Sequence, residues 1–288
     1  MPTYQISYKS TNTYEKPIIS AVLDYLIIPV TDHRQQLVSS NVITSPEVKY
    51  FLATQIRGFD VYRCRLPRRT NSFMFSYAAQ VEVQSFNPFD IQLLFIEEEK
   101  MLQQSEQFKL ENYFFIQQSK HTELPKDIAI PQLMADESGF DFLLRVKSFV
   151  KDYITYDLDA ADIFRNVPEI IAAKRGVCQD YAHLMIAICR NSGLPARYVS
   201  GYLHTVDNVT EATAIHAWVE VLIPGVGWVG VDPTNDLLVN QHYIKIAHGI
   251  DHSECSILKG FLQSSGKNTT EYMVTVQDQY QQEQVQQQ

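Results

Sequence analysis

The chain has 288 residues, enough for about two domains and a sizeable buried core. A hydrophobic fraction of 45% and a charged fraction of 20% are typical of folded proteins and exclude disordered, collagen-like and fibrous classes. Lysine and arginine total 24 against 33 aspartates and glutamates, so the formal net charge is −9. This charge repels phosphate and anionic lipid, and we therefore expect no nucleic-acid partner and no membrane partner.

Targeting signals and cysteine usage bear on the compartment. The amino end has no positively charged segment followed by an apolar run, so no secretory signal is predicted. The most apolar stretches, such as Ala21–Val30, are much shorter than the roughly 18 residues of a transmembrane helix. The cysteines at positions 64, 178, 189 and 255 are too scattered for a secreted disulfide framework. These signals predict a soluble protein of the reducing cytoplasm.

The first part of the chain is a series of short runs rich in Val, Ile, Tyr and Phe. Polar or proline-containing breaks separate these runs, a pattern typical of antiparallel strands. The predicted strands are Tyr4–Tyr8, Ala21–Val30, Val48–Ala53, Phe59–Leu66 and Ser72–Val83. Between residues 86 and 137 the periodicity weakens, which indicates connecting structure and a domain boundary.

Two helices are predicted in the second part. Apolar residues recur at three- and four-residue steps from Phe142 to Tyr153, with Ser138 or Asp141 as the N-cap. A second helix is expected from Cys178 to about Asn191, because a glycine and a proline follow it.

Strands follow the second helix at Arg197–Leu203, His216–Leu222 and Trp228–Val231, and the last two form a hairpin. We therefore predict an α+β protein with three parts. Residues 1–135 are a β-rich amino-terminal domain and connector, residues 136–276 a catalytic domain, and residues 277–288 a glutamine-rich mobile tail.

Cys178 is the first candidate for chemistry. A thiol at a helix start faces unpaired backbone N–H groups and the positive end of the helix dipole, which favour the thiolate and can receive an oxyanion. Gly176 allows close backbone approach before the helix, and Asp180 in the first turn suits the dipole. Taken alone, Cys178 is more typical of a small buried apolar residue than of a nucleophile.

The hairpin supplies possible partners for the thiol. His216 and Asp232 have the same strand parity, so they share a face if the loop has three or five residues. They would then lie opposite or diagonal to each other, within hydrogen-bond reach. A carboxylate there fixes the imidazole tautomer and supports the imidazolium. Taken alone, the histidine is also typical of a core residue, and an aspartate before proline is typical of a turn. Taken together, the cysteine, histidine and aspartate match a nucleophile, its base and the carboxylate that orients the base.

Four motifs in order resemble the bacterial branch of the transglutaminase-like superfamily. They are Gly176-Val-Cys-Gln-Asp180, Gly193-Leu-Pro-Ala-Arg-Tyr-Val-Ser-Gly-Tyr202, His216-Ala-Trp-Val-Glu220 and Gly227-Trp-Val-Gly-Val-Asp-Pro-Thr234. The resemblance implies a papain-like α+β core, in which a helix carrying cysteine packs on an antiparallel sheet carrying histidine and aspartate. It carries the family's catalytic triad onto Cys178, His216 and Asp232, with no cofactor.

Two further segments extend the resemblance. Thr13-Tyr-Glu-Lys-Pro17 resembles the family's usual amino-terminal β domain, although this chain has Arg57-Gly-Phe-Asp60 where such domains have Asp followed by Gly-Asn. Residues 240–252 resemble the family segment after the aspartate, but Ile250 replaces the common Arg and His252 the common aromatic residue. These departures are expected to alter the rim of the site and substrate choice.

Three functions are consistent with these residues. The favoured one is thiol-dependent hydrolysis of a peptide, amide or isopeptide bond, with a peptide or protein substrate. Acyl transfer to an amine, the transglutaminase reaction, differs only in what attacks the acyl-enzyme. In a non-catalytic scaffold the triad would survive as packing. A zinc site at His242, His248, His252 and Cys255 is a weaker alternative, because the spacing follows no familiar ligand pattern.

Overall fold

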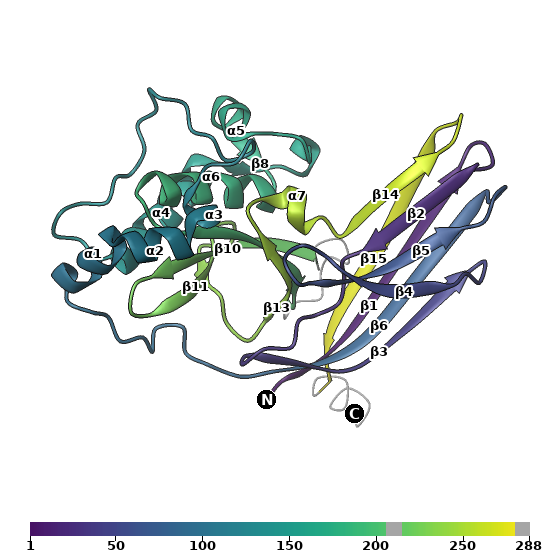
Figure 1. The fold of residues 1–288 in the computed structure, drawn as a ribbon, viewed down its shortest axis with the longest axis horizontal. Helices are drawn as coiled ribbons and strands as arrows, with labels where there is room; N and C mark the ends of the chain where they lie inside the picture. The colour runs from purple at the N-terminus through teal and green to yellow at the C-terminus, as the bar shows by residue number, and fades with distance from the viewer. Residues whose placement is uncertain (206–214, 280–288) are drawn as a thin grey trace.

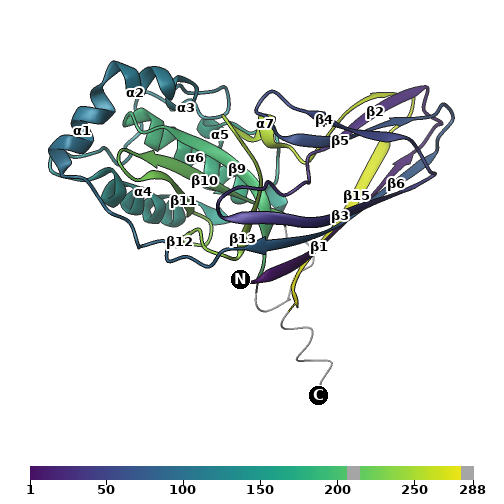
Figure 2. The same cartoon turned by 60° about the horizontal axis from the view of Figure 1, so that its bottom comes forward.

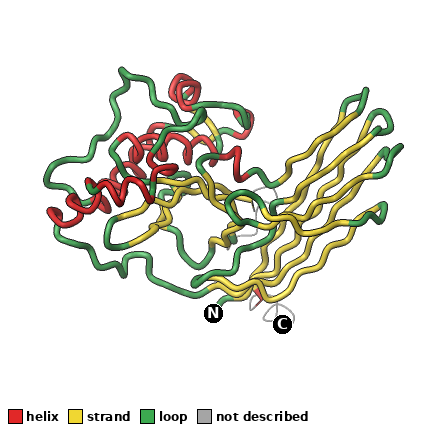
Figure 3. Tube along the Cα trace, viewed as in Figure 1, coloured by secondary structure: helices red, strands yellow, loops and turns green. Residues whose placement is uncertain are grey.

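The computed structural model describes residues 1–205 and 215–279. Its helices and a five-stranded sheet form a core on one side, and long strands form a two-layered β region on the other (Figure 1). The same division is plain when the chain is coloured by secondary structure (Figure 3). The predicted α+β class, with an all-β amino-terminal region before a helix-and-sheet core, is confirmed.

The β region is a sandwich of two four-stranded sheets, with the orders β15-β1-β6-β3 and β14-β2-β5-β4. Its strands are β1 (Thr3–Tyr14), β2 (Ser20–Tyr25), β3 (Gln35–Ser45), β4 (Tyr50–Thr54), β5 (Asp60–Leu66), β6 (Ser72–Val83), β14 (Leu258–Gln263) and β15 (Asn268–Asp278). All paired neighbours are antiparallel.

Alternation along the strands builds an aromatic interior between the two sheets. In β1 and β6 every second residue is buried, which is the pattern of a strand with one face on a core. Tyr25 from β2 stacks on Phe75 from β6, with ring centroids 3.9 Å apart. Asn12, which is 3% exposed, points into this interior and donates a hydrogen bond to the Tyr25 hydroxyl at 3.3 Å.

Three short helices occupy the connector, where no regular element is predicted. They are α1 (Ile96–Gln104), α2 (Glu106–Glu111) and α3 (Tyr113–Ile116). Helix α1 carries three acidic residues in its first turn, and Glu99 is buried, where its carboxylate accepts the Gly139 N–H at 2.7 Å. The connector is therefore attached to the start of the next long helix.

The core is built on an antiparallel sheet with the order β12-β11-β10-β9-β13. The strands are β9 (Ala196–Leu203), β10 (Ile215–Ile223), β11 (Gly227–Asp232), β12 (Leu237–Leu238) and β13 (Tyr243–Gly249). Helix α6 (Cys178–Asn191) packs on β9 and β10, and α4 (Gly139–Tyr153) packs on α6. Figure 2 shows α1 and α4 at the end of the core away from the sandwich. Short elements complete it: β7 (Thr155–Tyr156), η1 (Leu158–Ala160), α5 (Val167–Ala173), β8 (Arg175–Gly176) and α7 (His252–Cys255).

Helix α4 begins where its capping residue predicts. The Ser138 hydroxyl accepts the Asp141 N–H at 3.1 Å, so Ser138 is the N-cap of α4. Helix α6 is buried along nearly its whole length, as expected for a helix between a sheet and other helices. No helix within the described ranges is both long and apolar enough to cross a bilayer.

The carboxyl-terminal strands differ from the predicted division of the chain. Residues 136–276 are expected to form one domain, but β14 pairs with β2 and β15 pairs with β1. The helix-and-sheet core therefore lies between two segments that together build the sandwich. The predicted mobile tail, 277–288, begins inside β15, and its residues 280–288 lie outside the described part of the chain.

Backbone and side-chain contacts join the sandwich to β13 and α7. Gln35 donates through Nε2 to the Lys245 carbonyl at 2.9 Å and accepts the Lys245 N–H through Oε1 at 2.8 Å. Arg57 makes a two-pronged ion pair with Glu254, at 2.8 and 3.1 Å. The turn at Arg57-Gly-Phe-Asp60, where the sequence departs from the family pattern, thus holds the short helix that follows β13.

Gly201 gives a test of packing under the site. It pairs with His216 across β9 and β10, and a Cβ built there would overlap the Trp218 ring and the Ile244 carbonyl oxygen. We expect Gly201→Ala to destabilise the protein by about 1–3 kcal/mol, because neither the backbone nor the indole can move freely. Urea unfolding measures this, with Ser200→Ala as the neighbouring control. A Gly201→Ala midpoint equal to that of the parent would contradict the close packing.

Candidate active site

The thiol of Cys178 lies at the first residue of α6 and is half-buried. The chain turns sharply before it: Val177 N–H donates to the Asp180 carboxylate at 2.8 Å. A Cβ at Gly176 would overlap the Asp180 side chain, which explains the glycine that the sequence places there. Burial raises the pKa of Asp180 to about 6, and Arg165 opposes this from 3.7 Å. The Asp180 N–H donates to the Val177 carbonyl at 2.8 Å, so the N–H groups of Cys178 and Gln179 are the ones that the first turn of α6 leaves for an acceptor.

The hairpin of β10 and β11 brings His216 and Asp232 together. Its loop has three residues, since Ile223 pairs with Gly227, and this is one of the two lengths that put the side chains on one face. His216 Nε2 lies 2.7 Å from Asp232 Oδ2, and their side chains are 8% and 0% exposed. A carboxylate only accepts hydrogen bonds, so Nε2 carries the proton and Nδ1 is the ring nitrogen left for the thiol.

The Asp232 carboxylate is held by more groups than the sequence predicts. Its Oδ1 accepts the backbone N–H groups of Thr234 and Asn235 at 2.9 and 3.2 Å. Its Oδ2 also accepts the Asn235 side-chain amide at 2.7 Å and the Tyr243 hydroxyl at 2.8 Å. Burial alone would raise the pKa of Asp232, but His216 and these donors lower it overall. Asp232 is thus an anion with saturated acceptor sites.

Sequence reasoning misses the roles of Asn235 and Tyr243. The signal for Asn235 is the run Asp232-Pro-Thr-Asn235, because an aspartate before a turn accepts backbone N–H groups two and three residues on. Tyr243 comes from β13, on the far side of the sheet order from β11, so nothing local in the sequence connects it to Asp232.

His216 is hydrogen-bonded to Asp232, and the Cys178 thiol interacts electrostatically with the same imidazole, so the three predicted residues lie beside one another. Burial disfavours charge on the imidazole, but the Asp232 carboxylate and the interactions with both neighbours raise the pKa of His216 to about 10. The ring is therefore an imidazolium near neutral pH. An imidazolium beside a thiol is the electrostatic partner that a nucleophilic thiolate requires.

The residues of the alternative zinc site have separate partners. His242 is bonded to the Tyr4 hydroxyl at 3.2 Å, His248 to Arg197 at 3.2 Å, and His252 to the Tyr198 hydroxyl at 3.4 Å. Cys255 is buried against the Tyr198 carbonyl. Within residues 1–205 and 215–279, no three His, Cys, Asp or Glu side chains are grouped so that they could hold a metal ion.

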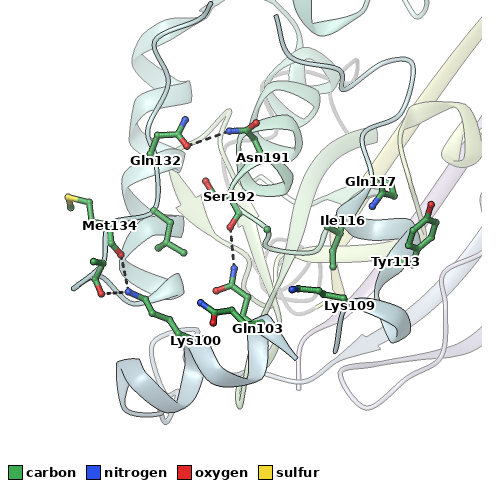
Figure 4. Close-up of a pocket in the computed structure, with 14 residues that line it drawn as sticks. Lys100, Gln103, Lys109, Tyr113, Ile116, Gln117, Gln132, Met134, Asn191 and Ser192 are labelled. Atoms are coloured by element: carbon green, nitrogen blue, oxygen red, sulfur yellow. Dashed lines mark hydrogen bonds between the residues drawn. The ribbon is translucent and has the colours of Figure 1, made fainter. Parts of the chain in front are cut away.

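Two cavities are large enough to hold a ligand, and their linings differ. One of about 600 Å³ is lined by His216 and Tyr243 and so adjoins the site. Another, of about 760 Å³, lies between the connector helices and the end of α6 (Figure 4). Its described lining contains lysines, amides and a tyrosine but no cysteine, histidine or carboxylate. Gln103 spans it by donating to the Ser192 carbonyl at 3.2 Å. The candidate active site is therefore the region around His216.

Comparison with known proteins agrees with this fold. Residues 127–233 match the model of the transglutaminase-like superfamily. An uncharacterized protein of Mycobacterium tuberculosis is 35% identical over 157 residues, which are 51% of this chain and 50% of that protein. A protein-glutamine gamma-glutamyltransferase of Pseudomonas aeruginosa is 40% identical over 67 residues, 21% of this chain and 10% of that enzyme.

A solved structure described as a putative cysteine protease from Cytophaga hutchinsonii superimposes with a TM-score of 0.68 at 19% identity, covering 96% of this chain and 91% of that one. The likeness shows a shared fold that includes the β region. The chain spans about half the length of the curated Mycobacterium tuberculosis relative it matches. Residues 127–233 belong to the transglutaminase-like superfamily, so the predicted family is confirmed for the core.

Thiol labelling gives a direct test of the cysteine assignment. Cys64, Cys189 and Cys255 are at most 1% exposed, and burial raises the pKa of Cys64 and of Cys189 to about 12. We expect iodoacetamide near neutral pH to modify Cys178 alone in the folded protein, since it is accessible and adjoins an imidazolium. Peptide mapping by mass spectrometry reads the result. Alkylation of Cys64 or Cys255 at the same rate would overturn the assignment.

Proposed function

We propose that this protein hydrolyses a peptide, amide or isopeptide bond through an acyl-enzyme on Cys178. The observation that carries the proposal is the His216–Asp232 hydrogen bond of 2.7 Å beside the Cys178 thiol, which interacts with the same imidazole. The superfamily core and the fold shared with a structure described as a putative cysteine protease support it. We further propose that the substrate is a peptide or protein and that the enzyme acts in the cytoplasm.

The roles follow from the geometry. The Cys178 thiolate attacks the carbonyl carbon, a C–S bond forms, and the carbonyl electron pair moves to oxygen, where first-turn N–H groups of α6 can stabilise it. When the tetrahedral intermediate collapses, the C–N bond breaks and the His216 imidazolium gives its proton to the leaving amine. Neutral His216 then takes a proton from water, which attacks the thioester and releases the acid and the thiolate. Asp232 supports the imidazolium and exchanges no proton.

Acyl transfer to an amine is the second candidate. It is favoured by the stretch that is 40% identical to a protein-glutamine gamma-glutamyltransferase. The two reactions share every step up to the thioester and differ in whether water or an amine attacks it. The acceptor therefore decides between them.

A product experiment separates these functions. Peptides are incubated with the protein with and without an added primary amine, and mass spectrometry identifies the acyl-enzyme and the products. Free acid in the presence of amine supports hydrolysis, whereas an amide of the added amine supports transfer. If no peptide acylates the parent protein more than Cys178→Ala, the proposal fails and a scaffold role for the core takes its place.

Chelation provides a further expected result. The thiol and imidazole need no Lewis acid for the steps above. We expect turnover to be unchanged after exhaustive dialysis against a chelator, measured as product formed per mole of protein. Loss of turnover that is restored by added zinc would contradict the mechanism and would support the alternative zinc site at His242 and Cys255.

A further inference from the structure

The cavity beside His216 has a positively charged side chain in its wall, and this side chain has no role in the proposed reaction. Its volume of about 600 Å³ lies in the range of about 300–1,000 Å³ that is usual for small-molecule sites. His216 and Tyr243 line it on the side of the Asp232 carboxylate. Tyr156 also lines it and interacts electrostatically with the Cys178 thiol, so a group bound in this cavity would lie near the site of the proposed reaction.

Lys151 supplies the unused charge. It lies in the last turn of α4, is exposed, and lines the cavity. Its ammonium donates to the Thr234 carbonyl at 2.7 Å, which fixes its position but leaves its charge uncompensated. Among the described residues no carboxylate lies within ion-pair distance of Lys151. Lys147, one turn earlier on the same helix, is instead paired with Asp236 at 2.8 Å.

The described part of the wall has no acidic side chain. None of the twelve described residues that line the cavity is an aspartate or glutamate, although the chain as a whole has a net charge of −9. The hydroxyl of Thr234 is buried in this wall and has no hydrogen-bond partner. A negatively charged protein thus presents a local cation to whatever enters this cavity, and a hydroxyl without a hydrogen-bond partner is buried in the wall beside it.

The connection from Lys151 to the catalytic residues is short and rigid. The residue whose carbonyl holds its ammonium, Thr234, also donates its backbone N–H to Asp232 at 2.9 Å. One turn therefore positions both the carboxylate that orients His216 and the ammonium in the cavity wall. A ligand held by Lys151 is placed in a fixed relation to the imidazole, as substrate positioning requires.

We propose that this cavity binds a carboxylate of the substrate, so that Lys151 selects acyl compounds with a free carboxylate within about one residue of the scissile amide. The inference rests on the proposed thiol chemistry for its effect on rate. The carboxylate has two possible sources, an acidic side chain and a chain-terminal carboxyl group. An ammonium recognises either one by the same charge-assisted hydrogen bond.

Three compounds distinguish the sources: acetyl-Ala-Glu-amide, acetyl-Ala-Gln and acetyl-Ala-Gln-amide. The first has only a side-chain carboxylate, the second only a terminal one, and the third has none. We expect kcat/KM of the parent to be at least about 10-fold higher for one or both of the acids than for the neutral compound. Lys151→Met is expected to abolish this ratio, Lys151→Glu to reverse it, and Lys151→Arg to retain most of it.

Lys147→Met is the matched control, because it removes a lysine from the same helix and leaves the cavity intact. It should keep the preference for the acids. Equal kcat/KM for all three compounds in the parent, or an unchanged ratio in Lys151→Met, would overturn the proposal. Melting temperatures of the variants identify any loss of folding. If Lys151→Met or Lys151→Glu does not fold, the ratio measured for Lys151→Arg tests the proposal.

Binding separates this inference from the proposed function. The same three compounds are titrated calorimetrically into Cys178→Ala, alone and combined with Lys151→Met. Acid-specific binding that depends on Lys151 supports the cavity even if the parent turns over none of them. Turnover without any charge preference would leave the thiol mechanism standing and remove the role of Lys151.

Discussion

Cys178→Ala is expected to lose all measurable acyl-enzyme formation and to lower turnover by at least about 10⁴-fold. Alanine cannot form the thioester, so water would have to attack the amide directly in a site built for a sulfur nucleophile. His216 and Asp232 keep their own hydrogen bond, because the thiol is not part of it.

The fold should survive this change. Cys178 is half-buried at a helix terminus rather than inside the core, so its replacement leaves only a small space. We expect the melting temperature to stay within a few degrees of the parent value. Cys255→Ala is the matched control, since this buried thiol is expected to leave acylation intact. Turnover by Cys178→Ala at the parent rate would refute the nucleophile assignment.

The second large effect is expected at Asp232. Asp232→Asn keeps the shape of the side chain but removes the charge that supports the His216 imidazolium. We expect kcat/KM to fall by about 10-fold to 10³-fold; asparagine serves in this position in some cysteine enzymes, so the loss should be smaller than in a serine triad.

The pH dependence of kcat/KM shows in which direction Asp232→Asn shifts the pKa of His216. The pKa of His216 is raised to about 10, so the ring is an imidazolium below that pH. Its contribution to the stability of the folded protein is complete below the ordinary histidine pKa of about 6.5 and is lost as the pH rises through 10. Without the carboxylate, burial dominates and lowers the pKa. The alkaline limb of kcat/KM should therefore move to lower pH in Asp232→Asn.

Asp236→Asn is the control for this variant. Asp236 lies in the same turn but pairs with Lys147 at the surface, and its positive φ of 59° is one that asparagine accepts. It should retain the parent rate and pH profile. An Asp232→Asn variant as active as the parent, with an unmoved alkaline limb, would reduce the mechanism to Cys178 and His216.

Local signals in the sequence were sufficient to place Cys178, His216 and Asp232 on α6, β10 and β11. Helix α6 is predicted by its apolar periodicity and by the glycine that follows it, and the hairpin register is set by a three-residue loop. Each depends on residues close together in the chain. The same holds for β6, which spans the predicted range Ser72–Val83 because its alternation is regular.

Long-range pairing accounts for what the sequence could not reveal. Strand β3 has little apolar alternation and is mostly exposed, since it lies at a sheet edge. Strands β14 and β15 read as part of the catalytic half because they follow it directly, yet their partners lie more than 200 residues earlier. Tyr243 reaches Asp232 from another strand for the same reason: the contact belongs to the sheet, not to a motif.

The order of strands in the sandwich has a consequence for synthesis on the ribosome. The Cα partner of Tyr4 is Asp278, and that of Ser20 is Gln263, so β1 and β2 emerge long before the strands that cover their outer edges. The helix-and-sheet core is made entirely in between and can close first. Until residues 258–278 appear, the nascent chain exposes two unpaired strand edges, which are templates for association with other chains. Chaperone occupancy is expected to persist to the last strands.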